Sequence, residues 1–203
     1  NEIFVRALKG ERPPTLPVQK EYRGTRCTDT RVPLAAQHAS HPAELVIRAH
    51  ELGYQALALT DECTYSGLVK AHVAAEKLKI KLIVGAEFSF KAESQSVDTD
   101  EKLILLAPTR SAYGQLSAFI STLRRRSNKG RYDAWLNDFS FGLKDCIALW
   151  VPSQQAIDLQ IALGNQVKAA LPKLWLALEL FHDGHDLDKT AHKLTLSSRL
   201  QLP

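Results

Sequence analysis

The sequence predicts an α/β domain in which strands alternate with helices. Short apolar runs typical of buried strands recur along the chain, and stretches with apolar residues at helical spacing lie between most of them. This alternation occurs five times, which indicates parallel strands joined by helical crossovers. The length of 203 residues suits one domain of ordinary size. An open doubly wound sheet and a βα barrel both fit this pattern.

The chain begins with a segment that shows no helical or strand period. Residues 1–38 predict an irregular arm because prolines interrupt any helix there, at Pro13, Pro14, Pro17 and Pro33. A first helix is then predicted around Pro42, with Ser40 as its candidate N-cap, and it ends at Gly53. Residues 39–203 therefore form the predicted domain.

The remaining elements follow from the change between apolar runs and helical spacing. Strands are predicted at 55–60, 80–90, 103–107, 146–151 and 174–180. Helices are predicted at 68–78, 111–126, 153–170 and 186–200. The polar stretch 91–100 is typical of a surface loop.

The composition argues against several classes of protein. The three cysteines, Cys27, Cys63 and Cys146, are far apart and form no CxxC pair, which argues against a disulfide scaffold and a zinc ribbon. No apolar run is long enough to span a bilayer and no signal peptide is visible, so a cytoplasmic protein without a membrane partner is predicted. The net charge of +4 permits a nucleic-acid partner without requiring one. The absence of methionine predicts a processed chain or a piece of a longer one.

Three carboxylates end or interrupt apolar strands, at Asp61, Glu87 and Glu179. In parallel α/β folds the carboxyl ends of the strands form the functional face. An acid placed there needs a metal ion or a basic side chain to offset its desolvation. The alternatives are a buried ion pair or, for Asp61, a cap on the next helix. The segment FHDGHD at 181–186 fits either a metal cluster or a polar turn.

The strongest basic cluster is the segment RRRSNKGRY at 124–132. Its charges are Arg124, Arg125, Arg126, Lys129 and Arg131. They fit two roles equally well: complementing the negative end of a helix, or contacting DNA phosphates. Tyr132 adds a surface on which a base could stack.

Several separate segments of the sequence resemble a known family and occur in the same order as in that family. Residues 39–88, the segments LILLAPTRSAYGQLS and RRRSNKGRY, and the strands LWVP and LWLALEL resemble the PHP domain that opens bacterial C-family DNA polymerases. The form TDEC at 60–63 resembles the error-prone branch. The resemblance covers residues 39–203. It implies a distorted βα barrel with a metal-binding cleft, in which Asp61 and Glu87 match ligand positions.

The chain departs from the family pattern in three places. Glu62 stands where the replicative branch usually has histidine. The first metal motif, expected just after Tyr22, is missing, and Cys27 is its only candidate remnant. The chain ends at QLP, before the family's Gly-Asp-Val-His block. The resemblance therefore implies an incomplete barrel with a vestigial site, which would bind Mn²⁺, Zn²⁺ or Mg²⁺ weakly at most.

The resemblance implies a parent enzyme that is an error-prone, DNA-directed DNA polymerase active in translesion synthesis. Its implied partners are DNA, the rest of the polymerase chain, and replication or mutasome proteins. Because the palm carboxylates that hold two metal ions lie outside these residues, no catalytic residue is assigned here. A structural or interaction module is expected. A metal-dependent phosphoesterase and a non-enzymatic DNA-binding module are the alternatives.

Overall fold

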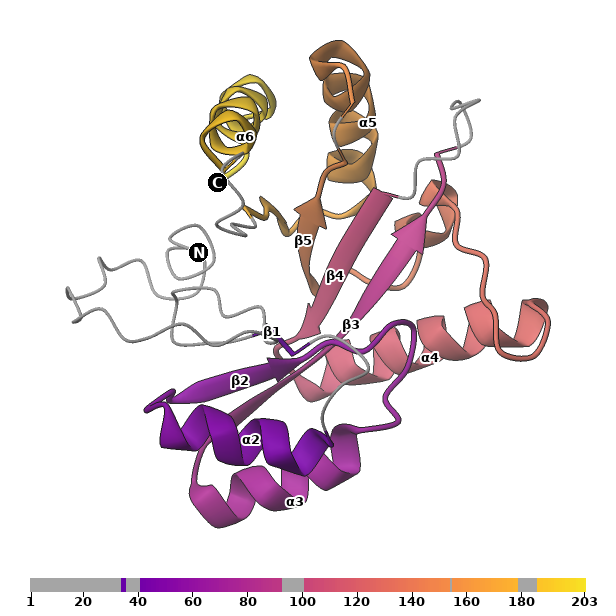
Figure 1. Cartoon of the computed structure of the whole chain (residues 1–203). Coiled ribbons are helices and arrows are strands. Elements are labelled where there is room, and N and C mark those ends of the chain that lie inside the picture. Colours follow the sequence, from indigo (N-terminus) through magenta and orange to yellow (C-terminus); the bar gives the residue numbers. More distant parts are fainter. Residues whose placement is uncertain (1–33, 36–40, 93–100, 154, 179–185) are drawn as a thin grey trace.

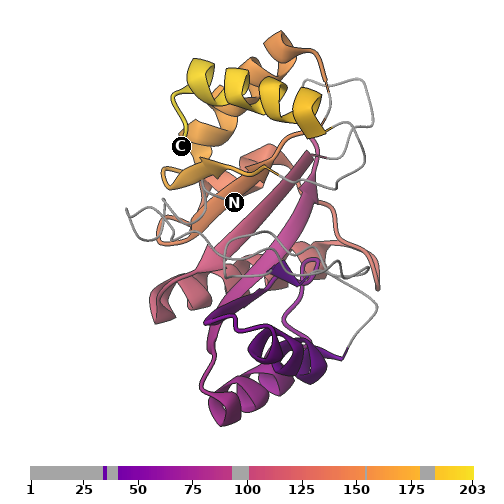
Figure 2. The same ribbon diagram turned by 60° about the vertical axis from the view of Figure 1, so that its left-hand side comes forward.

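A computed structural model of the chain describes residues 34–35, 41–92, 101–153, 155–178 and 186–203. Most of the predicted arm lies outside these residues, as do Glu179 and residues 181–185 of the FHDGHD segment. Figure 1 shows a central sheet with α5 and α6 at one end and α2 and α3 at the other. Figure 2 shows the same division from a second direction.

Six strands form one sheet, and their order in the sheet is their order along the chain. They are β1 (Leu34–Ala35), β2 (Ala56–Leu59), β3 (Lys81–Phe90), β4 (Glu101–Ala107), β5 (Ile147–Val151) and β6 (Leu174–Leu176). The first three strands are parallel to one another, and β5 is parallel to β6. The mixed α/β class predicted from the sequence is confirmed.

The prediction that all strands are parallel was wrong, because β4 runs antiparallel to both of its neighbours. The sequence predicts a loop rather than a helix between β3 and β4. Strands joined without a helical crossover pair antiparallel, which explains the direction of β4 relative to β3. As a result, β4 begins at the edge of the sheet where β3 and β5 end.

The described residues form five α-helices and one 3₁₀ helix, which lie between the strands except for the last helix, which follows β6. They are α2 (Pro42–Glu51), α3 (Leu68–Leu78), α4 (Arg110–Arg126), η1 (Leu136–Ser140), α5 (Ile157–Ala170) and α6 (Asp186–Leu200). The N-cap of α2 is His41 rather than the predicted Ser40, and its amide donates to Glu44 at 3.3 Å. Thr109 caps α4 by accepting from the Ala112 amide at 3.2 Å. The 3₁₀ helix was not predicted, because a single tight turn carries little periodicity.

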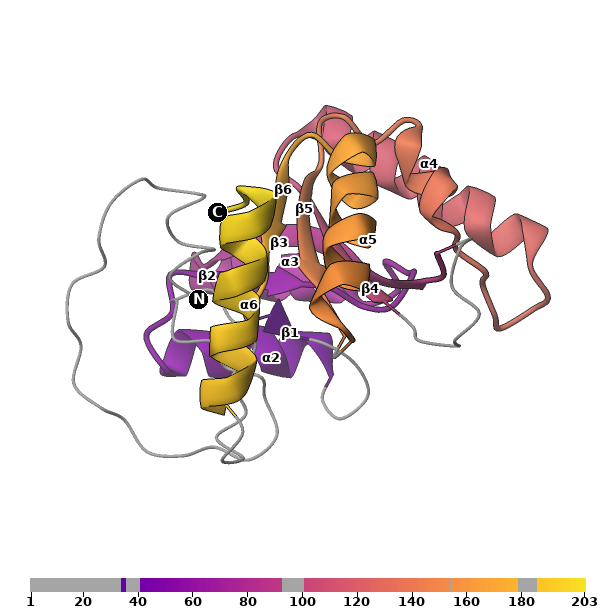
Figure 3. The same cartoon turned by 90° about the horizontal axis from the view of Figure 1, so that it is seen from above.

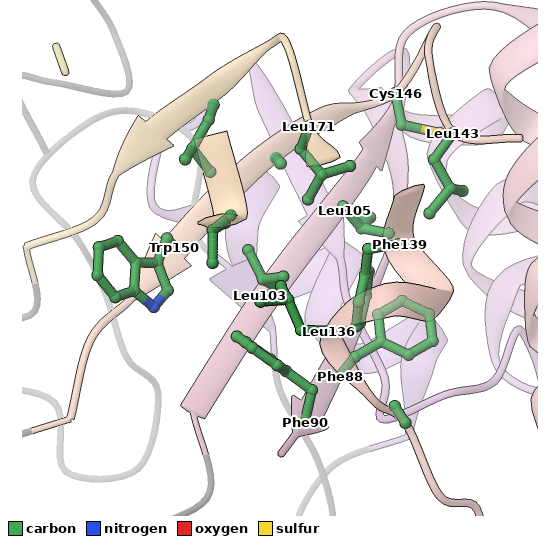
Figure 4. Close-up of a cluster of buried hydrophobic side chains, with 14 of the residues drawn as sticks. Phe88, Phe90, Leu103, Leu105, Leu136, Phe139, Leu143, Cys146, Trp150 and Leu171 are labelled. Atoms are coloured by element: carbon green, nitrogen blue, oxygen red, sulfur yellow. The ribbon is translucent and has the colours of Figure 1, made fainter. Parts of the chain in front are cut away.

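The described helices pack on one face of the sheet. Alternate residues of β2, such as Leu57 and Leu59, meet α2 and α3 in one cluster. Phe88 and Trp150 belong to a larger cluster with side chains of α4, α5, α6 and η1. Figure 4 shows Phe139 of η1 among Phe88, Leu103 and Leu105. Figure 3 shows α6, α5 and α4 following one another from left to right.

The opposite face of the sheet carries a second apolar cluster. Its buried members are Ala58, Ile104, Leu106, Leu149 and Val151. Strand pairing explains this set, because these residues alternate with those that face the helices. We call this surface the inner face. A sheet with helices on one side and an apolar inner face on the other agrees with the predicted incomplete βα barrel.

The described helices include none that is both long enough and apolar enough to span a membrane.

Candidate functional site at the carboxyl edge of the sheet

The directions of the strands bring several charged residues to one edge. The parallel strands β2 and β3 end at this edge, and the antiparallel strand β4 begins there. Asp61 follows β2, Glu87 lies in the last third of β3, and Lys102 is the second residue of β4. This edge is where α/β folds place their functional groups.

Pairing between β2 and β3 continues beyond the regular part of β2. The amide of Glu87 donates to the carbonyl of Asp61 at 3.2 Å, and the amide of Cys63 donates to the carbonyl of Glu87 at 2.9 Å. Glu62 is therefore the direct neighbour of Glu87. Cys63 then ends the pairing with a φ of 49°, in the left-handed region. The segment 61–63 is thus held firmly against β3.

The carboxylate of Glu87 forms an ion pair with Lys102. The Lys102 ammonium donates to Oε1 at 2.9 Å, and the exposed fractions of the two side chains are 12% for Glu87 and 38% for Lys102. Glu87 lies opposite Ile104 in β4, and Lys102 lies opposite Ser89 in β3, so the two charges meet across a diagonal of one strand pair. Both side chains lie on the inner face, and the apolar cluster of that face reaches them at Ile104, opposite Glu87.

Asp61 turns toward the helical side of the sheet. Its Oδ2 lies 3.3 Å from the position that a Cβ atom would take on Gly67. Gly67 is the residue before α3, so this carboxylate lies beside the amino end of a helix. Asp61 and Glu87 are therefore adjacent through their backbones while their carboxylates lie on different sides of the sheet.

Arg124, at the end of α4, fastens the segment that contains Glu62 and Cys63. Its guanidinium donates to the Cys63 carbonyl at 3.1 Å and to the Glu62 carbonyl at 3.0 Å. It also donates to the Arg131 carbonyl at 3.3 Å and lies over the ring of Tyr132 at 5.3 Å. One of the five predicted DNA contacts thus makes extensive contacts within the protein.

Tyr132 completes this connection from the other side. Its hydroxyl donates to Oε1 of Glu62 at 2.8 Å and accepts from the Ser89 amide at 2.8 Å. Burial raises the pKa of Tyr132, and the hydrogen bond to Glu62 raises it further. Its ring packs edge-on against Phe88. These contacts make Tyr132 a structural residue rather than an open stacking surface.

Arg126 is likewise engaged within the protein, through a two-pronged ion pair with Asp138 of η1. Burial would raise the pKa of Asp138, but hydrogen bonds from Arg126 and from the Trp135 amide outweigh it and lower that pKa. The side chains of the other three predicted DNA contacts are exposed: Arg125, Lys129 and Arg131. We call these three residues the basic loop. They lie at the end of α4 and in the loop that follows it.

Glu101, the first residue of β4, is fully buried and accepts hydrogen bonds from four donors. The Trp150 indole donates at 3.0 Å and the Ser153 amide at 3.2 Å. The Ser153 hydroxyl and the Gln155 amide group, the latter at 3.2 Å, complete the set. This carboxylate therefore ties the start of β4 to the segment that follows β5.

The described residues do not fit a catalytic metal site. They contain no group of three or more histidine, cysteine, aspartate or glutamate side chains placed to hold one ion. Such an ion needs at least three protein ligands. Burial raises the pKa of the Cys63 thiol to about 11, although Arg124 opposes the shift, so this cysteine stays protonated at neutral pH. Glu87 already holds the Lys102 ammonium.

Sequence reasoning identified Glu87 but missed Lys102 and Glu101. The signal was present in EKLILLA, where two charged residues open an apolar strand. Alternation along a strand puts Glu101 on one face and Lys102 on the other. The partners of Glu101 and Lys102 depend on how β4 pairs with β3 and β5, and the sequence does not specify that pairing.

Known proteins resemble this chain both in sequence and in structure. A family model described as the PHP domain matches residues 35–188. An error-prone DNA polymerase from Teredinibacter turnerae is 50% identical over 171 residues, and one from Saccharophagus degradans is 39% identical over 165 residues. Each alignment covers 81% of this chain and 15% of the relative. The chain thus spans about 15% of the length of these relatives.

Two solved structures share the fold at 15% sequence identity. An amidohydrolase from Chromobacterium violaceum superposes with a TM-score of 0.64 over 85% of this chain and 84% of its own. A protein assigned as a metal-dependent phosphoesterase from Bifidobacterium adolescentis superposes with a TM-score of 0.57 over 83% of this chain and 82% of its own. At this identity the likeness supports the fold alone.

Proposed function

Because this chain belongs to the PHP domain family, we propose that it is the PHP domain of an error-prone DNA polymerase and serves there as a structural and interaction module. The observation that carries the proposal is the 50% identity with an error-prone polymerase over 81% of the chain. The contacts of the acidic residues at the edge where β2 and β3 end support a non-catalytic role. Glu87 is paired with Lys102, and Glu62 with Tyr132. The work of such a domain, in the cytoplasm, would be to support the rest of the polymerase and its replication or mutasome partners.

Exchange of the domain into a relative tests this proposal. We expect this chain to restore primer extension when it replaces the matching segment of the Teredinibacter turnerae polymerase, because half of the aligned residues are identical in the two proteins. The same polymerase without the segment is the control, and it should lose stable folding and extension together. The isolated chain should extend no primer. Extension by the isolated chain, or a folded but inactive hybrid, would contradict the proposal.

A metal-dependent phosphoesterase is the second candidate, because Asp61 and Glu87, which match metal-ligand positions of the family, lie on adjoining strands at the edge used by α/β enzymes. Mn²⁺, Zn²⁺ or Mg²⁺ would be expected to bind there only weakly, since Glu87 already holds a cation. Release of nitrophenol from a phosphodiester analogue, measured with and without each metal, decides the matter. Metal-dependent release that disappears in Glu87→Gln would establish this activity.

Contact with DNA through the basic loop is the third candidate, favoured by the exposure of Arg125, Lys129 and Arg131. We expect replacement of all three by alanine to weaken DNA binding and to reduce the slope of log K against log salt by up to about 2.7, at roughly 0.9 per phosphate contact. Fluorescence anisotropy across a salt series measures both quantities.

A matched control removes three exposed charges elsewhere, at Lys77, Lys81 and Arg199. It changes the net charge equally but leaves the basic loop intact. Equal losses of DNA affinity in the two variants would show that binding depends on net charge rather than on this loop. An unchanged affinity in the first variant would exclude it as a DNA contact.

A further inference from the structure

We propose that Lys102 is the resident cation of this site, and that its ammonium group neutralises Glu87 in place of a divalent metal ion. The inference rests on the proposed function, since it explains how a domain of this family can remain folded as a non-catalytic module. It assigns a role to a residue that lies on a different strand from the carboxylate it serves.

The surroundings of Glu87 require a cation. Its carboxylate is 12% exposed and lies on the inner face, directly opposite Ile104. The apolar cluster on that face includes Leu106 and Leu149, so the local medium screens charge poorly. An ionised carboxylate in such a place is costly unless an opposite charge or several donors meet it.

Lys102 supplies this cation, and the pairing of β3 with β4 is enough to place it. It enters from β4 one diagonal step from Glu87 and donates at 2.9 Å. Because 38% of its side chain is exposed, the ammonium group keeps part of its hydration while it contacts the carboxylate. The ion pair thus avoids most of the desolvation that a fully buried pair would suffer.

A metal ion would have to displace Lys102 to reach the same carboxylate. It would bind at about 2 Å from the oxygen, and an ammonium group already at hydrogen-bond distance would repel it. The neighbouring carboxylates offer little help, because Glu62 accepts from Tyr132 and Asp61 turns toward Gly67. Lysine needs only the one acceptor, whereas a metal needs at least three ligands.

The test is a double-variant cycle measured by thermal and chemical unfolding of the full chain. We expect Lys102→Met to lower the folding equilibrium constant about fivefold to thirtyfold, because the carboxylate is left without its cation. Glu87→Gln added to Lys102→Met should recover most of that loss. Lys81→Met, at an exposed lysine at the far end of β3, is the matched control and should change little.

Metal titration completes the test. The melting temperature of the unaltered chain should be the same in millimolar MnCl₂ and in EDTA. A clear rise with MnCl₂ in the unaltered chain would overturn the proposal, as would a Lys102→Met loss that Glu87→Gln does not repair. Should Lys102→Met fail to fold, folding of the double variant supports the proposal and its failure contradicts it. None of these outcomes depends on primer extension, so failure here is distinguishable from failure of the proposed function.

Discussion

Replacement of Phe139 by alanine is expected to lower the free energy of unfolding by about 3 to 5 kcal/mol. The ring is fully buried in η1 and lies at the centre of an aromatic cluster. Its centroid lies 5.0 Å from that of Phe119, 5.4 Å from Phe90 and 6.0 Å from Phe88. Helix α4 and strand β3 both contribute to this cluster, so a cavity here cannot close by the shift of one element alone.

Urea unfolding followed by circular dichroism measures this loss. The matched control is Phe141→Ala, two residues away, whose ring is 79% exposed. It should change the free energy of unfolding by no more than about 0.5 kcal/mol. Similar effects of the two substitutions would show that the aromatic cluster does not stabilise the fold as described.

Replacement of Glu101 by alanine is expected to lower the free energy of unfolding by about 3 kcal/mol or more, and here the reason is the loss of hydrogen bonds. The carboxylate receives hydrogen bonds from Trp150, Ser153 and Gln155, and its loss removes the acceptor of the buried Trp150 indole and of the half-buried Ser153 and Gln155 donors. Each buried donor without an acceptor costs on the order of 1 to 3 kcal/mol. Neighbouring water can reach only those donors nearest the surface, so the loss is not repaired by solvation.

Two further variants separate hydrogen bonding from packing at this position. Glu101→Gln keeps the shape and one acceptor, so it should lose less stability than alanine. Glu76→Ala removes an exposed glutamate from α3 and should be nearly neutral. The midpoint of denaturation, at constant slope, is the measurement. A neutral Glu101→Ala would mean that the donors find other acceptors.

Much of the fold could be predicted because buried strands and amphipathic helices leave strong patterns. QALALT became β2, and the helix predicted at 111–126 became α4 within one residue at its start. The direction of β4 could not be predicted from alternation alone, because pairing is set by contacts between strands. The strand predicted at 174–180 is described only as Leu174–Leu176.

The candidate site could likewise be predicted only in part, because the sequence does not specify which strands pair. Position along the chain places Asp61 and Glu87 at one edge, as expected from the ends of two strands. The order of residues does not specify which side chain each carboxylate contacts. Lys102, the partner of Glu87, belongs to β4, which runs in the opposite direction to β3. Arg124 and Arg126 look identical in sequence to Arg125, yet successive helical residues point about 100° apart. Only the packing of α4 determines which of the three make contacts within the protein.

The order of strands in the sheet has a consequence for how the chain folds. From β2 to β6 each strand pairs with the one that precedes it in the sequence. Only the segment between two neighbours must form a loop, which keeps the entropy of closure small. Pairings that are close in sequence form faster than distant ones. A ribosome delivers the amino end first, so the sheet can grow one strand at a time while the rest of the chain is still being synthesised.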